Sequence, residues 1–380
     1  MNFIEIKGLF ATRLTVGRLF QGALIGALVA SWASPAWALD GLVPGSRYLT
    51  ARGAAMGDAY QPFADDGPES LFYNPAAFGH LRGTHFEPMN LSFYATGDYL
   101  GQIGLDSYKI ISLSSYKDTL IKNPGTFPGI GLQYVGSFAT RDLGFGLLIR
   151  TDTQANADNG AGTIRYRSNY QIIPAVGGGL RLASGILRLG YSLQWVNQAS
   201  GDVTIPQTNT DIGFRNVIAQ GSGLSSTGGA SLTLPWEWLP QFDVVARNIF
   251  GTHFGGFTLL PIATNSNGQP PEEKMTFDGS FAIQPKLGDG MTIRFATVFK
   301  DFTNSYNNTV IARLAIGGEF DFRNEFFLRL GIGSGYPSAG VGFRRKGAEF
   351  NLTWYSVERG ASLRAERDQR FLLQYQFRAF

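Results

Sequence analysis

The sequence contains no cysteine. This absence excludes a disulfide framework, a thiolate metal site, a cysteine nucleophile and a lipidated N-terminal cysteine. Only three histidines are present, His80, His85 and His253, and no two of them form an HExxH pair or a similar pattern. We therefore expect neither a histidine-based metal centre nor any other cofactor.

Charged residues are also scarce, at 16% of the 380 residues, where about a quarter is usual. The formal net charge is only +3 and no basic run occurs, so a nucleic-acid partner is not expected. Glycine, with 49 residues, is roughly twice as frequent as usual, and aromatic residues make up 13%. This composition suits short strands joined by turns, with a surface that is not wholly in contact with water.

The N-terminus has the features of an export signal. Lys7, Arg13 and Arg18 form a basic region, and the uncharged stretch "LFQGALIGALVASWASPAWA" follows it. Ala36-Trp37-Ala38 offers small residues at both recognition positions, so we predict cleavage after Ala38. Residues 1–38 are thus expected to be a signal peptide. The alternative is an uncleaved membrane anchor, but the apolar core is short and interrupted by serine and proline.

No later window holds 18 consecutive apolar residues, so no transmembrane helix is expected in the mature chain. Segments of about ten residues instead alternate in polarity, which gives each segment one apolar and one polar face. Fourteen strands are predicted, with cores at 86–96, 127–138, 142–152, 163–180, 186–198, 224–235, 241–250, 275–286, 291–300, 309–321, 326–332, 338–344, 348–357 and 369–380.

The connections distinguish a membrane barrel from a soluble sandwich. Even-numbered connections are short, such as "LASG" and "FRNE", whereas odd-numbered ones tend to be long. Short turns at one end and long loops at the other are typical of outer-membrane barrels. We therefore predict an all-β fold, a transmembrane antiparallel β-barrel of about 14 strands formed by residues 84–380. Outer-membrane lipid and the barrel assembly machinery are its expected partners, and the barrel is expected to be a monomer.

A barrel in a membrane must present apolar side chains to lipid, so the polar side chains of its strands line the lumen. We interpret these polar residues as ion pairs that fill the lumen, with ligand binding as the alternative. By phase, the candidates include Arg150, Arg188, Arg294, Arg313 and Glu319.

The chain ends on an aromatic residue, as outer-membrane barrels do. Phe380, however, is out of phase with Phe371, Leu373, Tyr375 and Phe377. The last strand is therefore predicted either to slip near its end or to stop before Phe380.

Residues 39–83 precede the first strand and do not alternate. "GAAMGDAY" predicts one short helix and "ADDGPES" predicts a turn. Asn74 is then expected to cap a second short helix that has Pro75 at its first position. An even number of strands places this segment at the periplasmic mouth, and its small apolar residues favour folding inside the barrel.

The stretch "RGAAMGDAYQPFADDGPESLFYNPAAFGHL" resembles the N-terminal hatch of the FadL long-chain fatty acid transporter superfamily, which includes PorV-type proteins. The resemblance implies that residues 39–83 close the lumen and that their displacement admits hydrophobic small molecules such as long-chain fatty acids. The PorV-type members imply the alternative, a non-transporting barrel that binds secreted or surface proteins. The hatch residues that carry the resemblance are Met56, Gly57, Asp65, Asp66, Tyr73, Asn74, Pro75 and Ala76.

One long connection, "GTHFGGFTLLPIA", is unusually apolar for a loop. Its Phe254, Phe257, Leu259 and Leu260 predict an external apolar groove for a hydrophobic ligand, although such a loop could equally dock a protein. His253 lies in the same connection, but no spacing links it to a serine and an acid. We therefore expect no enzymatic activity.

Overall fold

The structure is a computed structural model that describes residues 47–102, 113–208, 218–259, 261, 268–288, 290–360 and 362–379. The predicted signal peptide, Leu260 and Phe380 lie outside the described residues.

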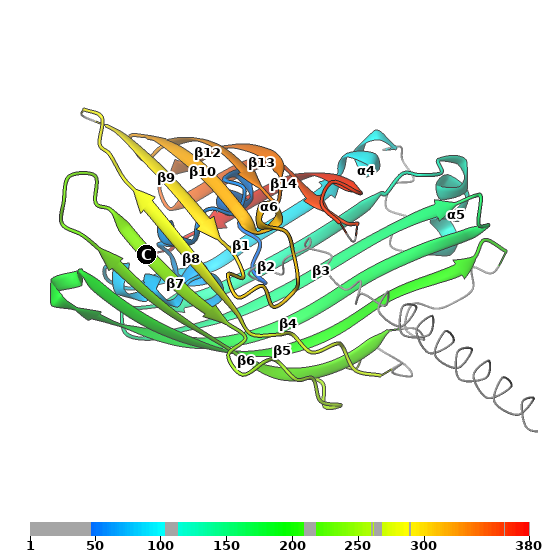
Figure 1. Ribbon diagram of the computed structural model, residues 1–380, viewed down its shortest axis with the longest axis horizontal. Coiled ribbons are helices and arrows are strands. Elements are labelled where there is room, and N and C mark those ends of the chain that lie inside the picture. The colour runs from blue at the N-terminus through cyan, green and yellow to red at the C-terminus, as the bar shows by residue number, and fades with distance from the viewer. Residues whose placement is uncertain are drawn as a thin grey trace, which may run out of the picture. The chain divides into compact units, whose positions relative to one another are not determined.

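Antiparallel strands close into a barrel in which β1 (His85–Thr96) pairs with the last strand, β14 (Arg367–Phe377) (Figure 1). Every other pair joins strands that are adjacent in the sequence, so the topology is a simple meander. The predicted barrel of 14 strands is confirmed. The other strands are β2 (Gly129–Ala139), β3 (Gly144–Asp158), β4 (Thr163–Leu182), β5 (Leu187–Pro206), β6 (Ala219–Thr233), β7 (Gln241–Arg247), β8 (Thr276–Ile283), β9 (Met291–Phe299), β10 (Leu314–Phe322), β11 (Phe326–Gly333), β12 (Tyr336–Arg345) and β13 (Ala348–Glu358).

The two faces of each strand differ in polarity, as alternation predicts. Along β14, Phe371, Leu373 and Tyr375 are exposed on the outer face, whereas Arg370 and Gln374 are buried on the inner face. The same pattern along the other strands surrounds the barrel with large exposed hydrophobic side chains. Among the helices that the structure describes, none is long and apolar enough to span a membrane.

Strand β10 begins later than predicted. Val310–Arg313 form a short helix, α6, and the Thr309 hydroxyl caps it by accepting a hydrogen bond from the Ala312 N–H at 3.4 Å. The predicted strand start at residue 309 is therefore wrong, and β10 begins at Leu314. β14 ends at Phe377, so the alternative in which the chain leaves the regular ladder before Phe380 is the one observed.

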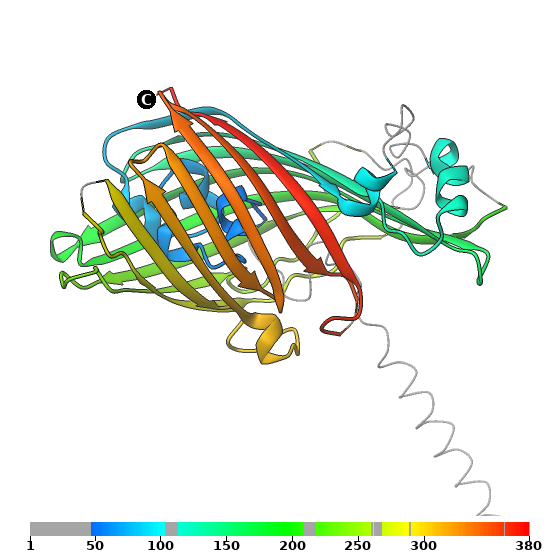
Figure 2. The ribbon, with the colours of Figure 1, turned by 90° about the horizontal axis from the view of Figure 1, so that it is seen from above.

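Two helices interrupt the connection between β1 and β2, where the sequence predicted none. α4 (Gly97–Gly101) and α5 (Leu113–Lys122) lie at the end of the barrel away from the C-terminus (Figure 2). Tyr99, Tyr116 and Leu120 join buried residues of β3, β4 and β5 in one apolar cluster. The predicted loop after residue 198 is shorter than expected, because β5 continues to Pro206 and β6 begins at Ala219. The extended end of β5 contributes to this cluster.

The chain before β1 folds into four short helices that lie within the ring of strands (Figure 2). These are α2 (Ala51–Ala55), η1 (Gln61–Phe63), α3 (Gly67–Phe72) and η2 (Pro75–His80). We call residues 48–81 the inner segment. Nearly all of its side chains are buried, and its helices contact strands on every side of the barrel.

Side-chain caps set where these helices begin. Asn74 accepts a hydrogen bond from the Ala76 N–H at 3.1 Å, and Pro75 occupies the first position of η2, as predicted. Asp66 accepts from the Glu69 N–H at 2.9 Å and caps α3, so the "ADDGPES" stretch starts a helix rather than forming only a turn.

Candidate functional site

The inner segment contacts the barrel wall most closely at glycine residues of the strands. A Cβ at Gly190 of β5 would lie 1.9 Å from the Pro75 carbonyl oxygen, and a Cβ at Gly331 of β11 would lie 2.1 Å from the Met56 carbonyl carbon. No side chain fits at either position, so glycine allows the two backbones to touch. Comparable approaches occur at Gly229 to Asn74, at Gly317 to Met56 and at Gly333 to Gly57.

These contacts form two seats on the wall. Asn74 to Ala76 occupy a seat on β5 and β6, and Met56 and Gly57 occupy a seat on β10 and β11. Five of the eight residues that carry the resemblance to a hatch thus meet these wall glycines, namely Met56, Gly57, Asn74, Pro75 and Ala76. The unusual glycine content of the sequence has a local explanation at these positions.

The Asn74 side chain uses both ends of its amide. Its oxygen caps η2, and its nitrogen donates to the Gln61 carbonyl oxygen at 3.0 Å, which joins η2 to η1. Arg247 of β7 then fixes the adjacent residue, because its Nη1 donates to the Tyr73 carbonyl oxygen at 2.9 Å. The motif around Asn74 is therefore held from inside the segment and from the wall.

An ion-pair network that is buried apart from Asp65 ties α2 to β10 and β11. Arg52, which is only 2% exposed, pairs with Asp65 at 3.0 Å and with Glu319 of β10 at 3.4 Å. Glu319 also pairs with Arg329 at 2.5 Å and with Arg294. Removing one member of such a network leaves an uncompensated buried charge, which typically costs about 3–5 kcal/mol.

Three carboxyl groups of the inner segment converge near this network. Ligand atoms of Asp65, Asp66 and Glu69 all lie within 4.8 Å of one another. Two arginines lie beside them: Arg52 pairs with Asp65, and Nη2 of Arg378, just after β14, lies 3.7 Å from Asp66. This arrangement suits charge compensation between the inner segment and the wall.

The surroundings of Asp65 and Asp66 shift their pKa values in opposite directions. Burial is the largest influence on Asp66, and repulsion from Asp65 adds to it, so that the Asp66 pKa rises to about 6 despite Arg378. Burial also acts to raise the Asp65 pKa, but Arg52 and further arginines outweigh it and hold that pKa at about 2. Asp65 is therefore charged at neutral pH, while Asp66 titrates close to it.

A further ionic contact lies at the edge of the inner segment. Lys300, directly after β9, pairs with the Asp58 carboxylate, and the Tyr73 hydroxyl donates to the same carboxylate. The Asp58 side chain is one-third exposed, so this contact is more open than the pair of Arg52 with Glu319, whose side chains are 3% and 0% exposed. We call the pair Asp58 and Lys300 the latch.

A cavity lies beside the latch, between the inner segment and the wall. It is lined by Tyr48, Thr50, Arg150, Tyr336, Tyr355 and Arg370, among others, and Asp58 and Lys300 reach its edge. Tyr336 follows the turn between β11 and β12, which lies at the opposite end of the barrel from the short turn at Lys346. The cavity is therefore on the side of the long connections, and it offers both ring faces and cationic groups.

The predicted lumen residues have two outcomes. Arg150, Arg188, Arg294 and Glu319 lie on inner faces of strands and have polar partners there, as in the contact of Arg150 with Asp152 at 2.7 Å. Arg313 does not lie in a strand, because it ends α6 and donates to the Asp301 carbonyl oxygen at 3.0 Å.

The predicted external apolar loop is partly wrong. Phe254 is buried in the main apolar cluster, whereas Phe257 is 67% exposed and stacks on Trp195 outside β5, with 5.9 Å between the ring centroids. The reason is that Gly255 pairs with Ser222 of β6, so this stretch forms part of the wall. Leu259 is exposed, and Leu260 lies outside the described residues.

His253, which no sequence spacing links to a serine and an acid, has an acidic neighbour in the structure. Its Nδ1 lies 3.4 Å from a Glu272 carboxylate oxygen, and both side chains are more than half exposed. An exposed pair of this kind is typical of a solvated surface contact.

Several residues that hold the inner segment were not found from the sequence. Arg47 donates to Gln194 at 3.1 Å and to Asn248 at 3.0 Å, and Lys300 forms the latch. Their partners are more than 140 positions away in the chain. An arginine such as Arg52 within a run of glycine and alanine was the one local signal available.

A closed barrel with an apolar outer surface, a polar inner face and a folded segment in its lumen defines the class of this protein. It is a multi-pass β-barrel of the bacterial outer membrane.

Comparisons with known proteins agree on the fold. No protein-family model and no curated protein matches the sequence. Among solved structures, the chain is similar to the toluene transporter TbuX of Ralstonia pickettii, with a TM-score of 0.51, 13% identity and coverage of 87% of this chain and 98% of that one. The chain is also similar to the CymD monoaromatic hydrocarbon channel, with a TM-score of 0.49 and 9% identity. That comparison covers 90% of this chain and 98% of the other. A FadL homologue of Pseudomonas aeruginosa has a TM-score of 0.39 and 12% identity, with coverage of 89% of this chain and 99% of that one. The similarity to TbuX confirms the predicted barrel fold.

Proposed function

We propose that the protein is a passive outer-membrane channel for hydrophobic small molecules and that residues 39–83 are its hatch. The observation that carries this proposal is the pair of glycine seats, because they fit the wall to one particular folded segment. The similarity in fold to a toluene transporter supports the same function. The division of the chain is then a signal peptide at 1–38, a hatch at 39–83 and a barrel at 84–380.

The cavity beside the latch suggests where a molecule waits before it passes the hatch. The rings of Tyr48, Tyr336 and Tyr355 offer apolar surface, and Arg150 and Arg370 lie within the same lining. Monoaromatic hydrocarbons and long-chain fatty acids both fit this mixture of ring faces and cations. We propose hydrophobic small molecules of these two classes as the cargo.

The contacts of the inner segment suggest the order of opening. The pair of Arg52 with Glu319 and the glycine seats are buried, so breaking them exposes charge and backbone to the lumen. The latch is partly exposed and borders the cavity, so water can replace its contacts at lower cost. We propose that opening begins at the latch while the two seats hold.

Uptake by whole cells tests the function. A bacterial host without a channel of this fold should accumulate radiolabelled toluene or oleate faster when it produces the protein. A control host should produce the protein with Gly67→Cys and Ala139→Cys, oxidised so that α3 is bonded to β2. If folded barrel is present in the outer membrane and neither compound enters faster than in the empty host, the channel proposal fails. The partner-binding alternative then takes its place.

A further inference from the structure

The short-turn end of the barrel carries an excess of exposed cations. The short turns hold three exposed acidic residues among those described, Asp142, Glu237 and Glu325. Exposed basic side chains outnumber them and lie in these turns, at the adjoining strand ends or just before β1. We call these the basic rim: Arg82, Arg141, Arg181, Lys286, Arg323, Arg345 and Lys346.

Within the described parts of the long connections, the opposite end does not share this charge bias. Exposed Lys122, Lys274 and Arg364 alternate there with exposed acidic residues in the same connections. Examples of these acids are Asp118, Glu272 and Glu366. The bias therefore belongs to one end of the barrel and is not a property of its surface as a whole.

Aromatic side chains place the basic rim at the depth of lipid headgroups. In the turn between β6 and β7, Trp236 is 65% exposed and Trp238 is 55% exposed. Phe145 and Phe343 are also half-exposed on the outer face close to rim cations. Exposed tryptophans collect where the hydrocarbon meets the headgroups. Cations in the same turns lie at the level of lipid phosphates.

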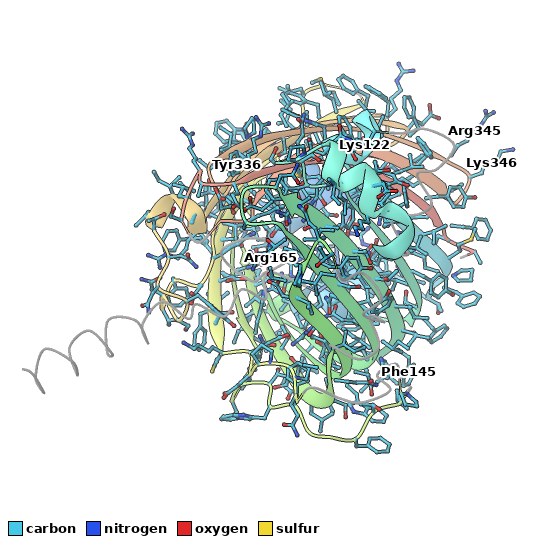
Figure 3. All side chains as sticks on the ribbon, turned by 90° about the vertical axis from the view of Figure 1, so that its right-hand side faces the viewer. Lys122, Phe145, Arg165, Tyr336, Arg345 and Lys346 are labelled. Atoms are coloured by element: carbon cyan, nitrogen blue, oxygen red, sulfur yellow. The ribbon has the colours of Figure 1, made fainter. Side chains whose placement is uncertain are left out.

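Two of these cations extend outward at a tight turn. Lys346 and Gly347 have φ values of 46° and 84° in the tight turn between β12 and β13. Figure 3 shows the Arg345 and Lys346 side chains extending away from the barrel. They are therefore available to groups that surround the barrel rather than to the lumen.

We propose that the basic rim binds the phosphate groups of anionic phospholipids. The short turns of outer-membrane barrels face the periplasm, so the partner is the phospholipid of the inner leaflet. Clustered basic residues attract anionic headgroups when the two lie within about a Debye length of each other. The rim side chains meet this condition if they lie at the level of the lipid phosphates. This binding is independent of the hatch and of any transported molecule.

Competition between lipids in native mass spectrometry tests the proposal. Purified full-length protein is mixed with equal amounts of phosphatidylglycerol and phosphatidylcholine of the same chain length, and bound lipids are counted. The rim variant carries Arg181→Gln, Arg345→Gln and Lys346→Gln. The matched control removes three exposed charges at the other end, with Lys122→Gln, Lys274→Gln and Arg364→Gln. Heat-modifiable migration in electrophoresis establishes that each variant is folded.

The parent and the control should prefer phosphatidylglycerol, and the rim variant should lose at least fivefold of that preference. A fivefold loss of preference corresponds to about 1 kcal/mol of binding free energy, which is the typical contribution of one basic residue near an anionic surface. An unchanged preference in the rim variant, or an equal loss in the control, overturns the proposal. A further arm replaces phosphatidylglycerol with lipid A. If the rim substitutions reduce lipid A binding more than phosphatidylglycerol binding, the assignment to the inner leaflet is wrong.

Discussion

The Pro75 carbonyl oxygen occupies the place that a side chain at Gly190 would need, with only 1.9 Å to the position of a Cβ. One residue belongs to the inner segment and the other to the wall, and they are separated by more than a hundred positions in the chain. The glycine at position 190 is therefore required by the inner segment that packs against it, not by the barrel strand itself. This relationship makes the docking of the inner segment accessible to experiment.

Two adjacent glycines of β10 provide a matched pair for this docking. A Cβ at Gly317 would lie 2.3 Å from the Met56 carbonyl oxygen, whereas a Cβ at Gly318 would have its nearest neighbour at 3.7 Å. We expect Gly317→Ala to weaken docking by about 1–3 kcal/mol, as overpacking does, and Gly318→Ala to leave it unchanged. Hydrogen exchange of peptides from residues 48–81 measures the difference. Equal exchange in the two variants would show that the wall glycines are not seats.

The Asn74 cap offers a test within the inner segment. Asn74→Ala removes the cap of η2 and the link to the Gln61 carbonyl oxygen, and Pro75→Gly frees the φ angle at the same joint. Loss of a cap typically costs about 1 kcal/mol. The double variant should keep a heat-modifiable barrel but show increased ion leak in planar bilayers. If leak stays at the parental level while deletion of residues 48–81 opens the pore, the motif is only a turn.

Coupling across the latch can be measured with a double-mutant cycle. Asp58→Asn and Lys300→Met each remove one partner of the contact, and each should raise the uptake of an apolar probe. The two effects should not add, because the second substitution removes a contact that is already lost. Strictly additive effects on uptake would mean that the two residues act separately.

The carboxyl group of Asp66 predicts a pH dependence with a definite sign. Its pKa in the docked segment is about 6, above the ordinary value near 3.9, chiefly because the group is buried. Between these two values the docked state binds more protons, so docking weakens as the pH rises from 4 to 6. The contribution is at most roughly 3 kcal/mol.

Asp66→Asn keeps a side chain that can cap α3 and removes this titration. Relative to the parent, the variant should dock more favourably at pH 7 than at pH 4. Hydrogen exchange of residues 48–81, corrected for the intrinsic pH dependence of exchange, provides the readout. A difference between parent and variant that does not change with pH would contradict the assignment.

The strands could be predicted because lipid on one side and polar groups on the other impose strict alternation. Alternation failed where another local interaction decided the structure, as at Thr309, whose hydroxyl caps α6. It also could not show that Gly255 pairs with Ser222, because that pairing depends on how the wall closes.

The candidate site was predictable only in part. The Asn74 cap is local and followed from its sequence neighbours. The partners of Arg52 and Lys300 and the identity of the seat glycines depend on the register of strands far along the chain. Such contacts arise from barrel closure and have no local signature.

The central claim is that the inner segment must move for molecules to pass, and a disulfide lock tests it most directly. A Cβ at Gly67 of α3 would lie 3.2 Å from the Ala139 Cβ of β2, close to the separation that a disulfide requires. Because the natural chain has no cysteine, Gly67→Cys with Ala139→Cys introduces one defined cross-link. Uptake of toluene or oleate is compared in oxidised and reduced cells, with each single variant as a control. The account predicts that uptake stops when the bond forms and returns to the level of the single variants on reduction. Equal uptake in the fully oxidised and reduced double variant would contradict it.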